Sequence, residues 1–325
     1  MIRETVILAG GRGERLKPLT DSLPKPLLPV NKLPVLSRVL REVEKCGITH
    51  ATLSLGYGAE KIKARYGNIF RTLSLSYSVE EAPLGTAGGV KKAALRGDPL
   101  MGKGDILVLS GDVLFEGDLT QLIDAHSRSG ADVTIAAKSL DDVSGFGVMV
   151  GSPRRIEAFI EKPDPESTPS HVVNLGIYVI SSRVLAEIPD GAYDFGKELF
   201  PALLEKGYTL SYCLYDDYWC DVGRFSSYLD ANLRLSSGKS CIGSGCTLPH
   251  SATVEESVLL DGVTVGEDCR ILRSILGENV TVAEGVKLEN CVIGEGCAVT
   301  SSLTDATVSQ SPDGLSVIKA PQPVY

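Results

Sequence analysis

The chain has 325 residues, of which 43% are apolar, and a formal net charge of −9, which suits a globular protein with room for two domains. Residues 241–308 hold ten acids and three bases, a net of −7, and the rest is nearly neutral, which argues against a nucleic-acid-binding surface. The sequence contains no apolar run of 18 residues, so we expect no membrane span. Its first residues show no basic region followed by an apolar core, so we expect no secretory signal and a cytoplasmic location.

The first predicted element is the short apolar run of residues 5–8, which is typical of a buried strand. It leads into Leu8-Ala9-Gly10-Gly11-Arg12-Gly13-Glu14-Arg15-Leu16, and Lys25-Pro26 follows shortly afterwards. Because Gly10, Gly11 and Gly13 lack side chains, their backbone amides can close on a polyphosphate. Arg15 and Lys25 would add positive charge at the same anion. A dinucleotide fingerprint would need glycine at position 16 and a P-loop would need a closing Gly-Lys-Ser/Thr, so an ordinary glycine turn is the remaining alternative.

Strand-like and helix-like segments then alternate as far as residue 235. Apolar periodicity predicts helices over residues 35–46, 59–66, 87–95, 118–126, 195–206 and 225–235. It predicts strands over residues 51–55, 73–79, 106–109, 132–138, 147–150, 155–160 and 172–180. This order favours an α/β fold with a Rossmann-like mixed, mostly parallel sheet that helices cover on both faces.

From Cys241 the pattern changes to a short repeat. Aliphatic residues return at intervals that are mostly six residues and sometimes five, often followed by glycine. One inward aliphatic side chain per interval indicates one short strand on each side of a triangular coil, and the pattern resembles the hexapeptide repeat of left-handed parallel β-helices. We therefore expect two domains, residues 1–237 and a short left-handed β-helix over residues 238–325. Its cysteines should be small buried fillers, because the chain has no Cys-x-x-Cys pair.

Two aspartates stand where a metal on phosphate oxygens could bind. Asp112 follows the predicted buried strand 106–109, at the edge where open α/β sheets bind ligands. Asp221 lies in Tyr218-Trp219-Cys220-Asp221-Val222-Gly223. Mg²⁺ takes few protein ligands and keeps several waters, so these two carboxylates suit a magnesium site. Each aspartate alone would more often be a turn or capping residue.

The glycine segment with its Lys25-Pro26 pair resembles the signature of the sugar-nucleotide pyrophosphorylases, also called sugar-1-phosphate nucleotidyltransferases. The resemblance implies that Arg15 contacts the phosphates of a nucleoside triphosphate, that Lys25 supports the same region, and that Asp112 and Asp221 bind Mg²⁺. The remaining nucleotide-binding positions that it implies in this segment are Leu8, Ala9, Gly10, Gly11 and Gly13.

Later motifs resemble the sugar-binding elements of the same family. In Glu161-Lys162-Pro163, the resemblance implies that the lysine contacts the sugar phosphate and that the glutamate binds sugar hydroxyls. A cation suits the first role and a hydrogen-bond acceptor suits the second. Gly147 and Asn174 complete the expected sugar site. Phe146 stands where the family has tyrosine, which removes a hydroxyl but leaves the backbone of Gly147 unchanged.

The segment that starts at Glu80 looks like the base-recognition element of the family, with Gly85 and Thr86 at the start of a helix. Members that use uridine or thymidine nucleotides typically have glutamine five residues before this glycine, where this chain has Glu80. A carboxylate is an acceptor only, so it could take two parallel hydrogen bonds from guanine and would oppose the acceptors of uracil. The segment thereby resembles guanylyltransferases for mannose 1-phosphate and heptose 1-phosphate. The alternative is a Glu80 side chain that only faces solvent.

The resemblance implies an enzyme that joins a nucleoside triphosphate to a sugar 1-phosphate and releases pyrophosphate, with Arg15, Lys25 and Lys162 as its catalytic cations. GTP and mannose 1-phosphate are the leading substrates; a heptose phosphate, or glucose 1-phosphate with UTP, dTTP or ATP, stays open. We expect a homo-oligomer with no nucleic-acid or membrane partner. A non-catalytic subunit that senses NDP-sugar is a different class of function, but such a chain should have lost the metal aspartates or the phosphate cations. An assembly scaffold based on the β-helix is the third hypothesis.

Overall fold

The computed structural model describes residues 2–95, 104–311 and 314–319; residues 312–313 and 320–325 of the predicted C-terminal domain lie outside this description. The chain forms two compact units, residues 1–11 with 38–219 and residues 12–37 with 220–325. Among the described residues, no helix is both long and apolar enough to cross a bilayer.

A mixed sheet forms the centre of the first unit and has ten strands within the described residues. These strands are β1 (Glu4–Leu8), β4 (His50–Leu55), β5 (Ile69–Phe70), β6 (Leu73–Val79), β7 (Ile106–Ser110), β9 (Val133–Ser139), β10 (Gly147–Ser152), β11 (Arg155–Glu161), β12 (Val172–Ile180) and β13 (Leu210–Leu214). They are ordered β11-β10-β12-β7-β1-β4-β6-β5, and β9 pairs with both β12 and β13. Strands β7, β1, β4 and β6 are parallel neighbours, so their carboxyl ends meet at one edge, and the expected α/β fold is confirmed.

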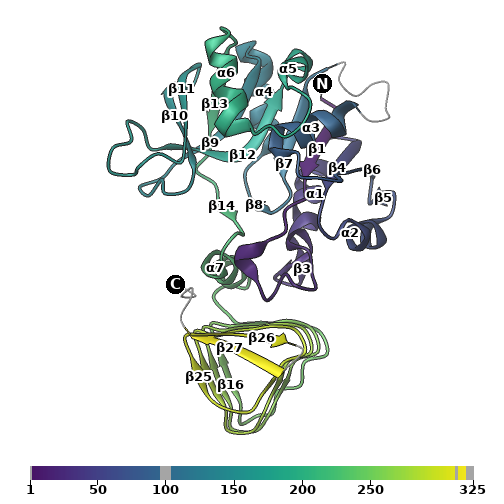
Figure 1. The fold of residues 1–325 in the computed structure, drawn as a ribbon, viewed down its shortest axis with the longest axis vertical. Coiled ribbons are helices and arrows are strands. Elements are labelled where there is room, and N and C mark those ends of the chain that lie inside the picture. Colours follow the sequence, from purple (N-terminus) through teal and green to yellow (C-terminus); the bar gives the residue numbers. More distant parts are fainter. Residues whose placement is uncertain (1, 96–103, 312–313, 320–325) are drawn as a thin grey trace. The chain divides into compact units, whose positions relative to one another are not determined.

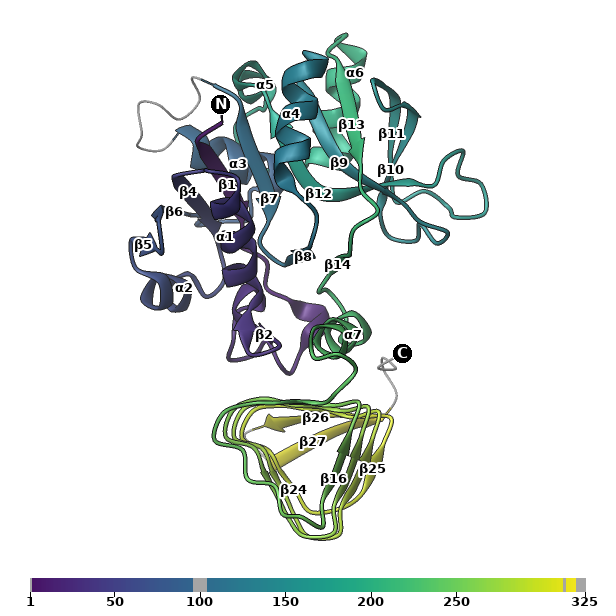
Figure 2. The same cartoon turned by 180° about the vertical axis from the view of Figure 1, so that it is seen from behind.

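Helices cover both faces of this sheet (Figures 1 and 2). They are α1 (Val35–Lys45, which begins in the second unit), α2 (Ala59–Tyr66), α3 (Gly85–Leu95), α4 (Leu119–Ser129), α5 (Ser182–Glu187) and α6 (Phe200–Glu205); a short strand, β8 (Val113–Phe115), precedes α4. Val133 and Ile135 of β9 join residues of α3, α5 and α6 in one apolar core. Thr134 points to the opposite face, where its hydroxyl lies 2.9 Å from Nδ1 of His126 on α4, because side chains alternate along a strand.

The predicted helix over residues 195–206 is divided in the structure. Its first part is a π-helical turn, η3 (Phe195–Leu199), and α6 begins at Phe200. The backbone N–H of Phe200 donates to the carbonyl of Phe195, five residues earlier. Pro201 comes next and has no N–H to continue the ladder, and π-turns of this kind often occur at functional sites.

The second unit contains the rest of the glycine segment and the C-terminal region. Its elements before the repeats are η1 (Glu14–Leu16), η2 (Lys25–Leu27), β2 (Pro29–Val30), β3 (Leu33–Pro34), most of β14 (Trp219–Asp221) and α7 (Phe225–Leu235). The buried Tyr228 of α7 donates from its hydroxyl to the carbonyl of Pro29 at 2.7 Å, and Asn232 accepts from the backbone N–H of Asn31 at 2.8 Å. These bonds fix the segment after Lys25 to α7.

The repeats form a triangular parallel β-helix (Figure 1), and its last strand, β27, pairs antiparallel with β26. Its strands are β15 (Cys241–Ile242), β16 (Thr253–Glu255), β17 (Val258–Leu259), β18 (Thr264–Val265), β19 (Arg270–Leu272), β20 (Ile275–Leu276), β21 (Thr281–Val282), β22 (Lys287–Glu289), β23 (Val292–Ile293), β24 (Ala298–Val299), β25 (Leu303–Thr304), β26 (Ala306–Ser311) and β27 (Gly314–Lys319). One coil takes 17 residues, since Cys241 pairs with Val258 and Val258 with Ile275, which agrees with sides of six and five residues. Cys269 and Cys291 lie in its apolar core, so the prediction that they are fillers is confirmed.

Candidate active site

The glycine segment leaves β1 at the carboxyl edge of the sheet and contacts the loops that follow β4 and β7. The backbone N–H of Ala9 donates to the carbonyl of Ser54 at 2.8 Å, and that of Gly111 donates to the carbonyl of Leu8 at 2.7 Å. A Cβ atom at Gly10 would lie 3.0 Å from the backbone nitrogen that follows Leu55, so glycine permits this close approach. A Cβ atom at Gly11 would have no neighbour within 4 Å, which leaves its backbone open to a ligand.

Two cations and one carboxylate converge in the second unit. The ammonium of Lys25 is buried, with 7% of the residue exposed, and lies 3.2 Å from Oδ1 of Asp221. A Cβ atom at Gly223 would lie 3.1 Å from both carboxylate oxygens of Asp221 and 3.2 Å from Nη2 of Arg15. Glycine at position 223 therefore admits both charged groups. A buried ammonium needs such a partner, and among these three side chains the cations outnumber the carboxylate.

Gly13 gives this segment its bend. It has a φ of 68°, a left-handed conformation that glycine adopts readily, and it precedes η1, which carries Arg15. A Cβ atom here would lie 2.9 Å from the methyl carbon of Thr20 and 3.0 Å from Cβ of Lys25. The missing side chain thus lets the segment fold back over Lys25.

The two aspartates expected to bind metal lie in different units. Asp112 is half-buried after β7, and Asp221 ends β14. Among the described residues, no group of three His, Cys, Asp or Glu side chains forms a ready metal cluster. Mg²⁺ needs only one or two carboxylates when substrate phosphates and water supply its other ligands. The carboxylate of Asp221 lies 3.2 Å from the ammonium of Lys25. Carboxylate oxygens are ligands that Mg²⁺ accepts, so the donor chemistry fits the ion.

Glu80 is half-buried and is bonded within the first unit. Its Oε1 accepts from the hydroxyl of Ser54 at 2.9 Å, and its Oε2 accepts from the backbone N–H of Leu84 at 3.0 Å. A Cβ atom at Gly89, on α3, would lie 2.7 Å from the same Oε1. Glu80 therefore holds the turn that leads into α3 and does not simply face solvent.

Gly85 and Thr86 at the start of α3 contact a segment that the sequence analysis did not select. A Cβ atom at Gly85, whose φ is 66°, would lie 2.6 Å from the carbonyl oxygen of Tyr193. The hydroxyl of Thr86 donates to Oδ2 of Asp194 at 2.8 Å and accepts from the backbone N–H of Phe195 at 2.9 Å. Asp194 caps η3. An aspartate directly before a helical pattern was the available signal for it.

The expected sugar-binding groups gather at the end of β11. Glu161 is half-buried, and its Oε1 lies 3.6 Å from Nζ of Lys162, whose side chain is 59% exposed. Lys162 has a φ of 49°, unusual for a residue other than glycine, and its N–H donates to the carbonyl of Phe146. A Cβ atom at Gly147 would lie 2.9 Å from Oε2 of Glu161. The structure thus brings Gly147, Glu161 and Lys162 together, with the ammonium directed to solvent.

Asn174 lies in an irregular stretch of β12. Its Nδ2 donates to the hydroxyl of Tyr178 at 2.8 Å, and its Oδ1 accepts from the N–H of Gly176 at 2.8 Å. Burial raises the pKa of Tyr178 far above its usual value; the hydrogen bond from Asn174 opposes this shift and the charges of Asp194 and Glu161 add to it. The tyrosine therefore stays neutral. It is hydrogen-bonded to Asn174 and lies close enough to Glu161 and Asp194 to be affected by their charges.

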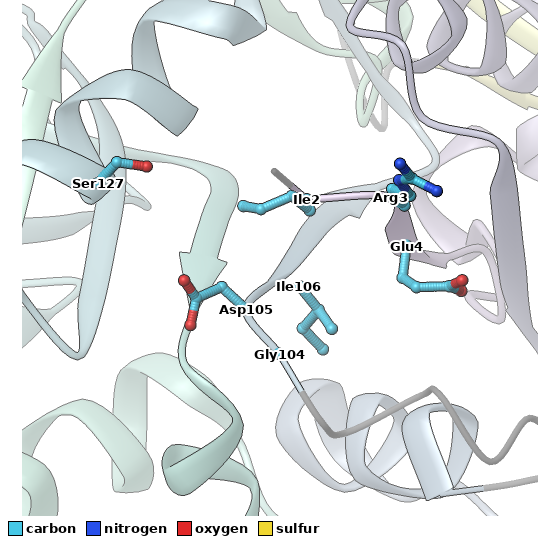
Figure 3. Close-up of a pocket in the computed structure, with 7 residues that line it drawn as sticks. All are labelled: Ile2, Arg3, Glu4, Gly104, Asp105, Ile106 and Ser127. Carbon is cyan, nitrogen blue, oxygen red and sulfur yellow. The ribbon is translucent and has the colours of Figure 1, made fainter.

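A hollow of about 380 Å³ lies at the opposite edge, by the amino ends of β1 and β7 (Figure 3). Its polar groups come from Arg3, Glu4, Asp105 and Ser127. None of the residues that line it belongs to the predicted site. Open α/β sheets bind ligands at the carboxyl edge of their strands, where the glycine segment lies, so we place the candidate active site there.

Two protein families match the chain, and its relatives include enzymes of known name. Residues 4–238 match the nucleotidyl transferase family, and residues 235–310 match the GMPPB C-terminal domain. A mannose-1-phosphate guanylyltransferase of Mycobacterium tuberculosis is 33% identical over 83% of each chain. A UTP–glucose-1-phosphate uridylyltransferase of Synechocystis is 33% identical over 70% of this chain and 62% of its own length. The crystal structure of HddC from Yersinia pseudotuberculosis complexed with GMP-PN covers 72% of this chain and 100% of its own, with a TM-score of 0.60 and 25% identity.

The match over residues 4–238 takes in more than half of the chain. It contains the glycine segment, the two cations expected to contact phosphate and both aspartates expected to bind metal. By this match the chain belongs to the nucleotidyl transferase family.

Proposed function

We propose that this protein transfers the guanylyl group of GTP to mannose 1-phosphate, which yields GDP-mannose and pyrophosphate. The observation that carries the proposal is the convergence of Arg15, Lys25 and Asp221 in the family's signature segment. The printed activity of the Mycobacterium tuberculosis relative supports this choice of base and sugar.

The chemistry needs no side chain that removes a proton, because the sugar phosphate is already an oxyanion. One of its oxygens attacks the α-phosphorus of GTP. The bond from that phosphorus to the bridging oxygen breaks, and pyrophosphate leaves with the electron pair. Catalysis then consists of alignment and charge neutralisation. In our proposal Arg15 and Lys25 neutralise the triphosphate, and the exposed ammonium of Lys162 holds the sugar phosphate.

Members of the family generally use a divalent metal ion. We assign Mg²⁺ here, with Asp112 and Asp221 as the side chains that would hold it. When bound, the ion would neutralise charge on the phosphate oxygens. Lys25 lies 3.2 Å from Asp221, so it would hold that carboxylate in place.

The choice of guanine rests on Glu80. Two of the roughly four lone-pair positions of its carboxylate are occupied by Ser54 and Leu84. The remaining positions can accept the two adjacent N–H donors of guanine. The same acceptors would oppose the carbonyl oxygens of uracil. A heptose phosphate as acceptor, and glucose 1-phosphate with another nucleotide, are the alternative substrates within the same reaction.

A non-catalytic sensor of NDP-sugar is the alternative from another class. Loss of a metal aspartate or of a phosphate cation would favour it, but Arg15, Lys25, Asp112, Lys162 and Asp221 are all present. We therefore favour the enzyme. The cytoplasmic location and the homo-oligomer stay predictions.

The test is a matrix of pyrophosphate release with GTP, ATP, UTP and dTTP against mannose, glucose and heptose 1-phosphates, with Mg²⁺ and with EDTA. We expect the highest kcat/KM for GTP with mannose 1-phosphate, and no release with EDTA. Another preferred pair would correct the substrates and keep the reaction. Tight binding of GDP-mannose without turnover on any pair would refute the enzyme and favour the sensor.

A further inference from the structure

The carboxylate of Glu161 lies in a small space between two glycines, Gly147 of β10 and Gly196 of η3, which we call the glycine socket. A Cβ atom at Gly147 would lie 2.9 Å from Oε2 of Glu161 and 2.5 Å from the ring of Phe159. A Cβ atom at Gly196 would overlap the same Oε2 and would lie 3.1 Å from the ring of Phe159. The position of the carboxylate therefore depends on the absence of two side chains.

Gly196 is not required by its backbone conformation. It lies inside the helical turn η3, it is buried, and its φ is not in the left-handed region. Glycine is an unfavourable residue in such a turn, because alanine loses less conformational freedom on folding. The space occupied by the Glu161 carboxylate is thus the physical reason for glycine at this position.

The backbone of Gly196 is held firmly and would not retreat from a new side chain. Oδ1 of Asp194 accepts from the N–H groups of Gly196 at 3.0 Å and Lys197 at 3.1 Å. The other oxygen of Asp194 accepts from Thr86 at 2.8 Å. A methyl group at position 196 would therefore displace the flexible end of Glu161 and leave the main chain in place.

We propose that Gly196 is a positioning residue for the sugar 1-phosphate, because it fixes the place at which the Glu161 carboxylate accepts a sugar hydroxyl. This inference rests on the proposed function, in which Glu161 contacts the sugar. It adds a residue of η3 that has no group of its own to offer a substrate. Its effect should fall on the sugar side of the reaction, since the phosphate cations lie on another segment.

The primary test is Gly196→Ala. We expect the KM for mannose 1-phosphate to rise about 10- to 100-fold, the scale of loss for a misplaced binding group, with the KM for GTP and the melting temperature unchanged. Gly104→Ala is the matched control, because a Cβ atom there would have no neighbour within 4 Å. It should change neither KM. A Gly196→Ala protein that fails to fold would overturn the proposal, because movement of the Glu161 carboxylate should accommodate the methyl group.

A double-mutant cycle separates this inference from the function on which it rests. In a Glu161→Ala background, Gly196→Ala should change the KM for the sugar phosphate less than about twofold, because the displaced group is gone. Additive effects would show that Gly196 acts by another route and would refute the proposal. If Glu161→Ala raises that KM and Gly196→Ala alone does not, the inference fails and the proposed function stands. No turnover by the wild type on any sugar phosphate would refute both.

Discussion

The Glu80→Gln substitution tests base recognition with little disturbance of the turn. The side-chain amide has the shape of the carboxylate, and its oxygen can accept from the backbone N–H of Leu84 in place of Oε2. Its NH₂ group would then face Ser54, whose hydroxyl can rotate to accept instead of donate. The turn before α3 should therefore persist, with the melting temperature within the error of the wild type.

The expected loss follows from the contacts that remain for a base. Glu80 can offer guanine two acceptor positions with a full negative charge, whereas glutamine would present a donor at one of them. Loss of a charge-assisted pair costs about 1.5–3 kcal/mol, or roughly 10- to 150-fold in kcat/KM for GTP at about 1.4 kcal/mol per decade. UTP and dTTP should improve relative to GTP, because an amide can both donate to O4 and accept from N3–H.

The assay is kcat/KM for GTP, UTP and dTTP with mannose 1-phosphate. Glu81→Gln is the matched control, because this neighbouring glutamate is exposed and the change in charge is the same. Ser54→Ala removes one hydrogen bond to Glu80 and keeps the charge of the carboxylate. It therefore shows how far kcat/KM depends on the hydrogen bonding that holds the turn, apart from base recognition. Equal losses for all three nucleotides in Glu80→Gln would refute base reading and leave Glu80 as a residue that only holds the turn.

Three further predictions concern the metal, the β-helix and acid stability. Asp112→Asn and Asp221→Asn should each lower Mg²⁺-dependent turnover at least about 100-fold. Asp221→Asn should also lower the melting temperature, because the buried Lys25 loses this carboxylate. Near-normal turnover of either variant would show that the substituted aspartate does not belong to the site. Deletion of residues 240–325 should change the oligomeric size or solubility and weaken GTP binding; a soluble truncated protein of unchanged assembly and GTP affinity would contradict both parts. Burial lowers the pKa of His126 below its usual 6.5, and the charges of Asp105 and Asp132 oppose this shift to a smaller extent. As the pH falls, the imidazole is therefore protonated in the unfolded chain before it is protonated in the folded protein. Stability should then fall as the pH drops below about 6.5. Melting temperatures should show a shallower fall in His126→Gln, and equal slopes would exclude the histidine as a cause.

Local patterns predicted the regular elements well. The helices 59–66 and 225–235 and the strands 73–79 and 172–180 have the predicted bounds, because each is an apolar pattern between clear breakers. The division of 195–206 into η3 and α6 was missed, since it depends on the missing N–H of Pro201 and on the cap that Asp194 provides. The 17-residue coil follows from the spacing of its aliphatic residues.

The candidate site was predictable only where its chemistry lies within one short segment. The glycine segment with Arg15 shows its spacing directly in the sequence. The bond from Ser54 to Glu80, the bond from Thr86 to Asp194 and the overlap at Gly196 join residues that lie far apart along the chain. No local periodicity reports such contacts, because side-chain packing between distant elements determines them.

We expect the C-terminal region to affect nucleotide binding, because it supports the segment that carries the two cations expected to contact phosphate. A Cβ atom at Gly294 of the β-helix would lie 3.0 Å from Cβ of Pro18, which shows how closely the segment after Arg15 packs against these coils. On the other side, α7 holds the segment after Lys25 through the hydroxyl of Tyr228. Before α1 begins at Val35, this segment has only short 3₁₀ turns and two-residue strands. It therefore has little internal structure to hold two cations in place, and ordering them costs conformational entropy. Packing against α7 and the β-helix would offset that cost before a nucleotide binds. We therefore expect the repeats to contribute to the proposed site, although they supply none of its predicted chemical groups.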